Sequence, residues 1–296
     1  MARSLGAVAV GCAKAGLVCD EVADAFARWL AEGRHGTMGY MERNVELRLD
    51  PRLLLPGAST IIALAFPYRP PRDMHHSYIA DFALGRDYHH VLRERLEPLC
   101  KFMAASYGAI SRVCVDSAPI MERYWAVKAG LGFIGLNRQL IVPGVGSGVF
   151  LAEVVTTLSL PPDSPLVEGC GDCGRCVDAC PGGALLADSI DGRLCRSYLS
   201  IEHKGLLPDE VSLGSCAYGC DICQRVCPHN AGEPPVPLDE FLPNTRLMNL
   251  DLDGLSRLTS GDWRRLTADS PMKRITIGRF RSNLQHVAPE EDSKSS

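Results

Sequence analysis

Cysteine is the residue type whose spacing most clearly indicates chemistry in this chain. Nine of the 13 cysteines lie between positions 170 and 227. The first four follow the pattern C-x2-C-x2-C-x3-C-P, which ends at Pro181, and the last three follow C-x2-C-x3-C-P, which ends at Pro228. Such runs hold pairs of [4Fe–4S] clusters, and the fourth cysteine of one run binds the cluster of the other. The sequence therefore predicts two clusters that transfer single electrons.

This crossed arrangement divides the cysteines into two ligand sets. The first predicted set contains Cys170, Cys173, Cys176 and Cys227, and the second contains Cys180, Cys220 and Cys223. The second set lacks a fourth ligand, because a complete second run would place it at position 217, which is alanine. Cys195 and Cys216 are the candidates. Cys216 is one residue out of register and is expected to project elsewhere, so Cys195 is favoured.

Two other interpretations of the cysteines are weaker. Disulfides need an oxidising compartment, and an odd number of cysteines cannot pair completely within one chain. Zinc sites favour paired C-x2-C knuckles and do not need the C-P endings. The remaining cysteines have no ligand spacing and are expected to be small buried hydrophobic residues: Cys12, Cys19, Cys100 and Cys114.

The bulk composition predicts a soluble protein with more than one structural unit. The chain has 296 residues, of which 46% are hydrophobic and 22% charged, as is typical of globular proteins. No apolar run approaches the roughly 20 residues of a membrane helix. Residues 5–12 resemble a lipoprotein signal, but their short apolar stretch favours a buried strand. Reduced thiols and clusters then predict a cytoplasmic location without membrane contact.

The charge distribution leaves the question of a nucleic-acid partner open. A net charge of −4 creates no global basic field. A local basic group lies near the end of the chain: Arg264, Arg265, Lys273, Arg274, Arg279 and Arg281. Taken alone, such a group is more typical of a solvated helix face.

Apolar patterning predicts strands and helices that alternate up to about residue 160. Strands are expected over 5–11, 59–66, 113–115, 140–142 and 149–157. Helices are expected over 20–32, 88–107 and 122–129. The glycine-rich loop 143–148 lacks the spacing of a phosphate-binding loop, so we interpret it as a hairpin turn.

Proline-rich segments at 161–165 and 233–237 divide the chain into three predicted parts. Residues 1–162 are expected to form an α/β or α+β domain, with α/β favoured, 163–232 a ferredoxin-like domain with two [4Fe–4S] clusters, and 233–296 a short helical tail. The fold class of the whole chain is therefore predicted to be α+β.

Several segments around the clusters together resemble one family. They are DSAPIMERYWAVKAGLGFIG (116–135), CGDCGRCVDACPGGAL (170–185), CRSYLSIEHKG (195–205) and YGCDICQRVCPHN (218–230). With GRDYHHVLRERL (85–96) and DPRLLLPGASTIIALAFPY (50–68), they resemble the epoxyqueuosine reductases over nearly the whole chain. The cluster motifs alone occur in many proteins, whereas this combination is specific.

The resemblance implies a fold, an activity and a set of cofactors. The N-terminal domain would be nitroreductase-like and would bind cobalamin, which in its reduced, nucleophilic state reacts with the epoxide carbon. The reaction converts epoxyqueuosine to queuosine at the wobble position of tRNA, the last step of queuosine synthesis. Two electrons would come from an unidentified reductant through the clusters, and the protein would be a monomer.

The resemblance also implies roles for individual residues. Asp116 would be the proton donor to the epoxide oxygen, although alone it would serve equally well as a helix cap. Burial at the end of an apolar strand is expected to raise its pKa. Residues implied to lie at the cobalamin are Asp87, His89, Asp116, Leu140, Leu151, Ser197 and Asp221. Residues implied to lie near the RNA are His203, Lys204, Lys273 and Arg274. The cysteine before S-Y-L, Cys195, would be the eighth cluster ligand.

The chain departs from the family pattern in places. Leu136-Asn137 stands where Lys-Asn is common, and the second cysteine run continues with PHN instead of PWN. The helical-repeat extension of longer members is missing, and the N-terminus is expected to be short. Two alternative functions are a corrinoid reductase of a small molecule, like the reductive dehalogenases, and a ferredoxin-type electron carrier. The roughly 160 residues before the clusters argue against a simple carrier.

Overall fold

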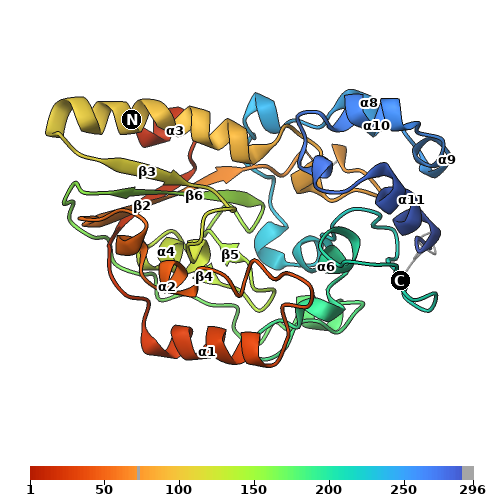
Figure 1. Cartoon of the computed structure of the whole chain (residues 1–296), viewed down its shortest axis with the longest axis horizontal. Coiled ribbons are helices and arrows are strands. Elements are labelled where there is room, and N and C mark those ends of the chain that lie inside the picture. Colours follow the sequence, from red (N-terminus) through yellow and green to blue (C-terminus); the bar gives the residue numbers. More distant parts are fainter. Residues whose placement is uncertain (72–73, 289–296) are drawn as a thin grey trace.

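A four-stranded sheet forms the centre of the N-terminal half in the computed structural model, which describes residues 1–71 and 74–288 (Figure 1). Across the sheet the strands follow the order β1 (Ala9–Lys14), β2 (Thr60–Pro67), β6 (Val149–Thr156) and β3 (Ser111–Cys114). Every neighbouring pair is antiparallel. The chain is a mixed helix and sheet protein, as predicted, but the α/β description of its first domain is wrong, because α/β folds contain mostly parallel sheets.

The long helices agree closely with the apolar periodicity. Helix α3 (Tyr88–Tyr107) has the predicted bounds, and α1 (Asp20–Ala31) and α4 (Glu122–Lys128) end within a residue of theirs. The first strand begins later than predicted, at Ala9 instead of residue 5. The reason is local: residues 2–5 form a 3-10 turn that ends at Gly6, whose φ of 94° requires glycine.

The hairpin predicted around residues 143–148 is wrong. Strand β5 (Leu140–Ile141) pairs with β4 (Phe133–Ile134), a short strand that the sequence did not indicate, and not with β6. Val142 and Gly146 do exchange backbone hydrogen bonds of 2.9 and 2.8 Å, so the loop is a tight turn. The chain leaves this turn toward the central sheet instead of folding back on β5.

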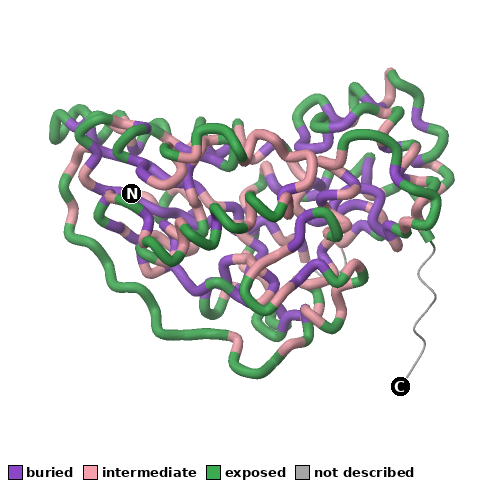
Figure 2. Tube along the Cα trace, turned by 60° about the horizontal axis from the view of Figure 1, so that its bottom comes forward, coloured by how far each residue is buried: buried purple, intermediate pink, exposed green. Residues whose placement is uncertain are grey.

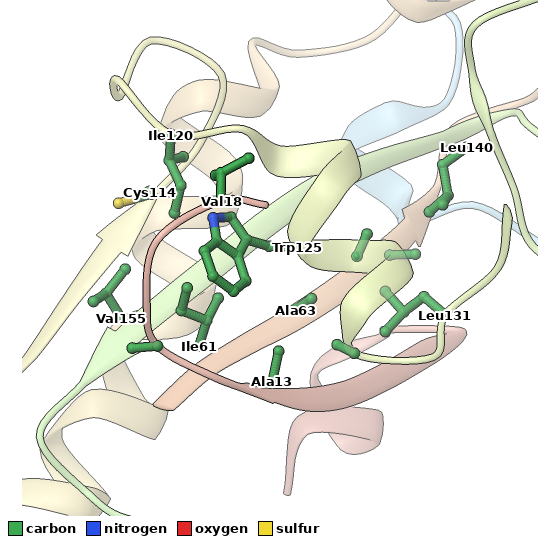
Figure 3. Packing of buried hydrophobic residues seen from close by; sticks show 14 of the residues in the cluster. Ala13, Val18, Ile61, Ala63, Cys114, Ile120, Trp125, Leu131, Leu140 and Val155 are labelled. Atoms are coloured by element: carbon green, nitrogen blue, oxygen red, sulfur yellow. The ribbon is translucent and has the colours of Figure 1, made fainter. Parts of the chain in front are cut away.

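Helices cover both faces of the sheet (Figure 1). On one face α3 contributes Leu92, Leu96, Leu99 and Met103, which pack against apolar residues of β2 and β6. On the other face α4 contributes Trp125, which lies among Val18, Ile61 and Val155 (Figure 3). Burial of a large apolar side chain stabilises the fold by about 1.5–3 kcal/mol. Helix α1 lies further out, and Phe26 is its only buried residue.

The predicted tail packs into the rest of the molecule. It contains α8 (Thr245–Met248), α9 (Leu252–Ser256), α10 (Ser260–Thr267) and α11 (Ile277–Gln285). Their side chains share one apolar cluster with Leu84, which precedes α3, and with Tyr218 of the cysteine segment. The three parts predicted from the sequence therefore meet in a common core.

Short helices and one extended connection complete the chain. The helices are α2 (Val45–Leu49), α5 (Arg175–Asp178), α6 (Arg196–Ile201) and α7 (Ile222–Arg225). Residues 161–169 are exposed and connect the sheet to the cysteine segment (Figure 2). Asp163 fastens this connection to β1, because its carboxylate accepts the Cys12 N–H at 2.8 Å. Within the described ranges, no helix has the length and apolarity needed to span a bilayer.

A substitution at Gly11 of β1 tests how closely the end of α4 approaches the sheet. A Cβ atom at this position would lie 1.9 Å from the Ala129 carbonyl oxygen at the end of α4. We expect Gly11→Ala to destabilise the protein by about 1–3 kcal/mol, because the backbone must shift to relieve the overlap. Gly16→Ala is the matched control, since a Cβ there meets nothing within 4 Å. Thermal unfolding would show equal melting temperatures for the two variants if this packing were loose.

Candidate functional site

Asp116 occupies the loop between β3 and α4 in an unusual backbone conformation. Its φ of 47° lies in the left-handed region, which residues other than glycine rarely adopt outside constrained sites. The backbone N–H of Asp116 donates to the Glu122 carboxylate. Its own carboxylate accepts a hydrogen bond from the Tyr88 hydroxyl at 3.0 Å and lies 2.9 Å from His89 Nε2. The side chain is 56% exposed, so a substrate can reach it.

The beginning of α3 positions the histidine that contacts Asp116. Asp87 is the N-cap of the helix, and its carboxylate accepts the His89 backbone N–H at 3.0 Å. The same carboxylate lies 2.7 Å from His89 Nδ1 and 2.6 Å from Lys273 Nζ. The imidazole is therefore held between two carboxylates, one at each ring nitrogen.

This arrangement determines where the protons are. Burial alone would lower the pKa of His89, but the hydrogen bonds to Asp116 and Asp87 outweigh it and raise the pKa to about 9. Desolvation opposes ionisation of Asp116, yet His89 and Tyr88 together hold its pKa below the ordinary value. The expectation that Asp116 has a raised pKa is wrong, because the carboxyl is exposed and faces an imidazolium. At neutral pH His89 carries the proton and Asp116 is ionised.

Two further side chains belong to this site although sequence reasoning did not select them. Glu122 touches Asp116, as described above. The ring of Tyr40 lies 5.8 Å from the Arg274 guanidinium, and burial, followed by the charges of Glu202 and Asp116, raises its pKa to about 12. Glu122 lies within the motif DSAPIMER, so its nearness to Asp116 in the sequence was an available signal. Nothing in the sequence pattern distinguished Tyr40.

The residues expected near RNA lie along one side of this site, paired with carboxylates. Arg274 donates two hydrogen bonds to Glu202, at 3.0 and 2.8 Å. The neighbouring His203 is half-buried against the Tyr198 ring, and Lys204 is exposed. Lys273 contacts Asp87, but its side chain remains 44% exposed, and that of Arg274 remains 54% exposed.

The rest of the basic group is more than a solvated helix face. Arg279 donates to the Gly205 and Leu199 carbonyls, and Arg281 donates to the Leu258 carbonyl. These bonds hold α11 against the cysteine segment and α9. The interpretation of the group as a simple exposed face is therefore wrong for these two arginines.

The first predicted ligand set surrounds one cavity. Its lining includes Leu136, Asn137, Ile141, Pro228 and His229 together with Cys170, Cys173, Cys176 and Cys227. The distant Cys227 thus joins the three cysteines of the first run. The Leu136 N–H points at the Cys170 sulfur from 3.4 Å, a contact that favours a thiolate. Cys173 is exposed and the other three are wholly or partly buried.

The second predicted set is also brought together. The charges of Cys180 and Cys195 both act on Cys223, and the Ala184 N–H points at the Cys180 sulfur from 3.3 Å. Cys195 is the N-cap of α6, and the N–H groups of Ser197 and Tyr198 face its sulfur. Cys220 lies near Cys195 as well.

Cys216 lies closer to this set than predicted. Its thiol is hydrogen-bonded to that of Cys220, so the expectation that it projects elsewhere is wrong. The tight turn at Gly214, whose φ is 58°, directs the side chain inward. Cys216 interacts with one member of the set, whereas Cys195 interacts with Cys180, Cys220 and Cys223. For the described residues, no group of three His, Cys, Asp or Glu side chains forms a site for a single metal ion.

A second cavity lies beside the second cysteine set and has a volume of about 510 Å³. Its polar lining residues are Tyr68, Arg69, His75, Asp81, Asp221, Gln224, Arg225 and Asn230. Asp221 is buried and accepts the Asp81 N–H at 2.7 Å. Burial, followed by the charge of Asp81, raises the pKa of Asp221 to about 6. The cavity thus combines guanidinium, amide and carboxyl groups.

The other residues expected at the cofactor lie elsewhere around the site. Leu140 is buried in β5, and Leu151 is half-buried in β6; both pack in the layer beneath α4. Ser197 is half-buried in the first turn of α6. Asp87 and His89 lie at the beginning of α3, as described above. The expected residues therefore come from three regions of the fold and not from a single pocket.

The chain matches two family models. Residues 48–117 match the model described as "Epoxyqueuosine reductase QueG, DUF1730", and residues 169–230 match the "4Fe-4S double cluster binding domain". Among curated relatives, the epoxyqueuosine reductase of Cyclobacterium marinum is 40% identical over 280 residues, which cover 92% of this chain and 89% of the relative. That of Leadbetterella byssophila is 38% identical over 274 residues, 90% of each chain.

Solved structures show the same similarity. An epoxyqueuosine reductase bound to an epoxyqueuosine-modified tRNA-Tyr stem loop superposes with a TM-score of 0.87 at 32% identity, covering 96% of this chain and 77% of the other. The Bacillus subtilis enzyme, captured with its catalytic aspartate loop swung out of the active site, gives a TM-score of 0.84 at 30% identity with the same coverage.

The eighth cluster ligand can be tested by iron analysis. If Cys195 is the ligand, Cys195→Ala is expected to lower the iron content from about eight to about four atoms per chain, because one four-iron cluster is lost. Cys216→Ala is the matched control and is expected to keep about eight. Iron and acid-labile sulfide would be measured on anaerobically purified protein. A full iron complement in Cys195→Ala together with a loss in Cys216→Ala would assign the ligand to Cys216.

Proposed function

The chain belongs to the epoxyqueuosine reductase family, and we propose that it reduces epoxyqueuosine to queuosine in tRNA, at the wobble position of the anticodon. The observation that carries this proposal is Asp116, an exposed carboxyl on a strained loop, in contact with a histidine that holds a proton. Relatives named epoxyqueuosine reductase match the chain over about nine-tenths of its length. The solved relative bound to a modified tRNA stem loop supports tRNA as the substrate.

Two [4Fe–4S] clusters fit the cysteines that the fold brings together. We assign one cluster to Cys170, Cys173, Cys176 and Cys227, and the other to Cys180, Cys195, Cys220 and Cys223. Each set has backbone N–H groups directed at sulfur, which stabilise thiolates and influence cluster potential. Cys173 is exposed, so the first cluster is the point where an external reductant would deliver electrons.

Cobalamin fits the polar lining of the cavity beside the second cysteine set. The periphery of a corrinoid carries amides and a phosphate, which hydrogen-bond well to carboxyl, amide and guanidinium groups. Asp221, Gln224 and Arg225 in the cavity lining supply these groups. When bound, the corrinoid supplies a strong nucleophile for the epoxide carbon. We propose that Asp87, His89, Leu140, Leu151 and Ser197 complete its surroundings.

The protein's own contribution to the chemistry is proton delivery. The reaction consumes two electrons and two protons, breaks the carbon–oxygen bonds of the epoxide and releases the oxygen as water. An epoxide oxygen is a poor leaving group until it is protonated. His89, held at 2.9 Å, first transfers its proton to the ionised Asp116 and returns to the neutral form. Asp116, which faces the open side of the site, then gives this proton to the epoxide oxygen.

Lys273, Arg274, His203 and Lys204 are proposed to hold the RNA. Phosphate contacts are mostly made by Lys, Arg and backbone N–H groups, and they set the position of the nucleic acid. Lys273 and Arg274 are engaged with Asp87 and Glu202, so a phosphate would have to compete with these carboxylates. We further propose that the protein acts as a monomer in the cytoplasm, where tRNA is found.

Nucleoside analysis of tRNA tests the activity directly. Deletion of the gene is expected to make epoxyqueuosine accumulate in tRNA, because the reduction step is missing, and a plasmid copy is expected to restore queuosine. Liquid chromatography with mass spectrometry of digested tRNA gives the result. A normal queuosine content in the deletion strain would disprove the proposed function.

The proton-donor assignment predicts a specific defect. Asp116→Asn is expected to lower turnover by about 10²–10⁴-fold, the range for removal of a general acid. Iron and corrinoid content should stay unchanged, because the exposed side chain contributes little to folding. Asp24→Asn, on the exposed side of α1, is the control. Full activity of Asp116→Asn with intact cofactors would refute the assignment.

A further inference from the structure

One carboxyl group lies in the middle of the sheet and has no partner. Glu153 of β6 is 0% exposed, and neither of its side-chain oxygens has a hydrogen-bond partner among the residues that the structure describes. Its neighbours across the sheet are Ala63 of β2 and Cys114 of β3. An ionised carboxylate in such a place would lose its hydration without compensation. Glu153 is therefore protonated in the folded protein.

The side chain of Glu153 points toward the layer beneath α4. Successive side chains of a strand alternate between faces, so Glu153 shares a face with Leu151 and Val155, which both pack in this layer. Val155 is visible there beside Ile61 (Figure 3). Trp125 of α4 lies in the same layer, and its Nε1 also lacks a partner within the described part of the chain. Burial, followed by the charge of Glu122, raises the pKa of Glu153 well above its ordinary value.

Glu122 connects this buried group to the active site. It is the first residue of α4, it is half-buried, and its carboxylate accepts the Asp116 N–H. Burial, followed by the charge of Asp116, raises the pKa of Glu122 to about 8. The other titratable or charged groups that act on this pair are His89, Arg123, Arg48, Tyr88 and Cys114. The cationic groups among them lower the pKa of Glu122 by less than burial raises it.

We propose that Glu122, kept neutral in front of the buried Glu153, stores a proton that reloads Asp116 during turnover. This inference rests on the proposed function, which consumes two protons for each epoxide. Asp116 then contacts two proton-bearing groups: imidazolium His89 at its carboxylate and neutral Glu122 at its backbone N–H. Both protons are in the site before the electrons arrive.

Each proton that Asp116 gives to the substrate is supplied by a neighbouring group. Asp116 is ionised at rest, so it first receives a proton from His89 and gives it to the epoxide oxygen, and it then receives the second proton from Glu122. After Glu122 has given up its proton it is a carboxylate, and because the residue is only half-buried it takes a new proton from water. Glu153 stays protonated throughout, because none of the described residues compensates for its lost hydration. Glu153 is a positioning residue in the layer beneath α4, the helix that begins at Glu122.

Infrared spectroscopy of the holoenzyme tests the proton store without turnover. Glu122→Gln minus wild-type difference spectra are expected to show the loss of a carboxylic-acid carbonyl band that titrates near pH 8. Glu153→Gln is expected to remove a second band that does not titrate over the stable pH range. Glu94→Gln, on the exposed face of α3, should change neither band. A Glu122→Gln spectrum without a missing carbonyl band would overturn the proposal.

The pH dependence of turnover is the second test. Wild-type activity is expected to decline above about pH 8 as Glu122 loses its proton. The Glu122→Gln variant should be slower by about tenfold and decline only above about pH 9, where His89 loses its proton. The loss is smaller than the 10²–10⁴-fold expected for a direct general acid, because His89 still supplies one proton. If the activity of Glu122→Gln declined at the same alkaline pH as that of wild type, the proposed proton store would be contradicted. If the chain reduced another substrate, the infrared result would still stand and the nucleoside analysis would fail.

Stability provides a third measurement, which also detects a purely structural role of Glu153. In the unfolded chain Glu153 releases its proton at about pH 4.3, whereas in the fold it keeps it. The unfolding equilibrium constant of wild type should therefore rise about tenfold relative to Glu153→Gln for each pH unit above that value. Parallel stability curves for the two proteins would mean that Glu153 is ionised in the fold, and the proposal would fail.

Discussion

The carboxylate of Asp87 is the interaction on which the rest of the site depends. As the N-cap of α3 it satisfies a free N–H of that helix, and the same group orients the His89 ring and binds Lys273. One side chain thus joins the first domain, His89 and the segment between the C-terminal helices α10 and α11. Because its pKa is held well below the ordinary range by His89 and Lys273, although burial opposes this, it remains charged wherever the fold is stable. His89 therefore keeps an anion at Nδ1 even when Asp116 becomes neutral.

Two further hydrogen bonds connect the cysteine segment to the same region of the fold. Asp221, beside Cys220, accepts the Asp81 N–H, and Tyr218 donates to the Pro271 carbonyl at 2.8 Å. The chain before α3, the second cysteine set and the C-terminal part therefore share one framework. The C-terminal helices are packed into this framework through the apolar cluster that they share with Leu84 and Tyr218, and they do not form a separate tail.

Sequence reasoning succeeded where the signal was local. Helix α3 has an Asp cap, a row of leucines and Gly108 at its end with φ of 64°, so each feature that defines its bounds lies within the helix or next to it. The strand order was out of reach, because periodicity says which residues face the core and nothing about which strands pair. The position of the Cys216 thiol was predicted wrongly for a related reason. The spacing rule assumes a complete cysteine run, and it does not include the turn at Gly214 that precedes Cys216.

The protonation of Asp116 was predicted with the wrong sign, and the error is informative. Its pKa depends on His89, 27 residues earlier in the chain, which no local pattern connects to it. The role proposed for Asp116, protonation of an epoxide on RNA, requires a carboxyl that is open to solvent, and an open carboxyl cannot keep a proton at neutral pH by burial. The proton must then be kept by neighbours that are themselves protected. His89 keeps one because two carboxylates surround it, and Glu122 keeps another because it is half-buried beside a negative charge. Exposure of the donor and storage of its proton are thereby assigned to different residues.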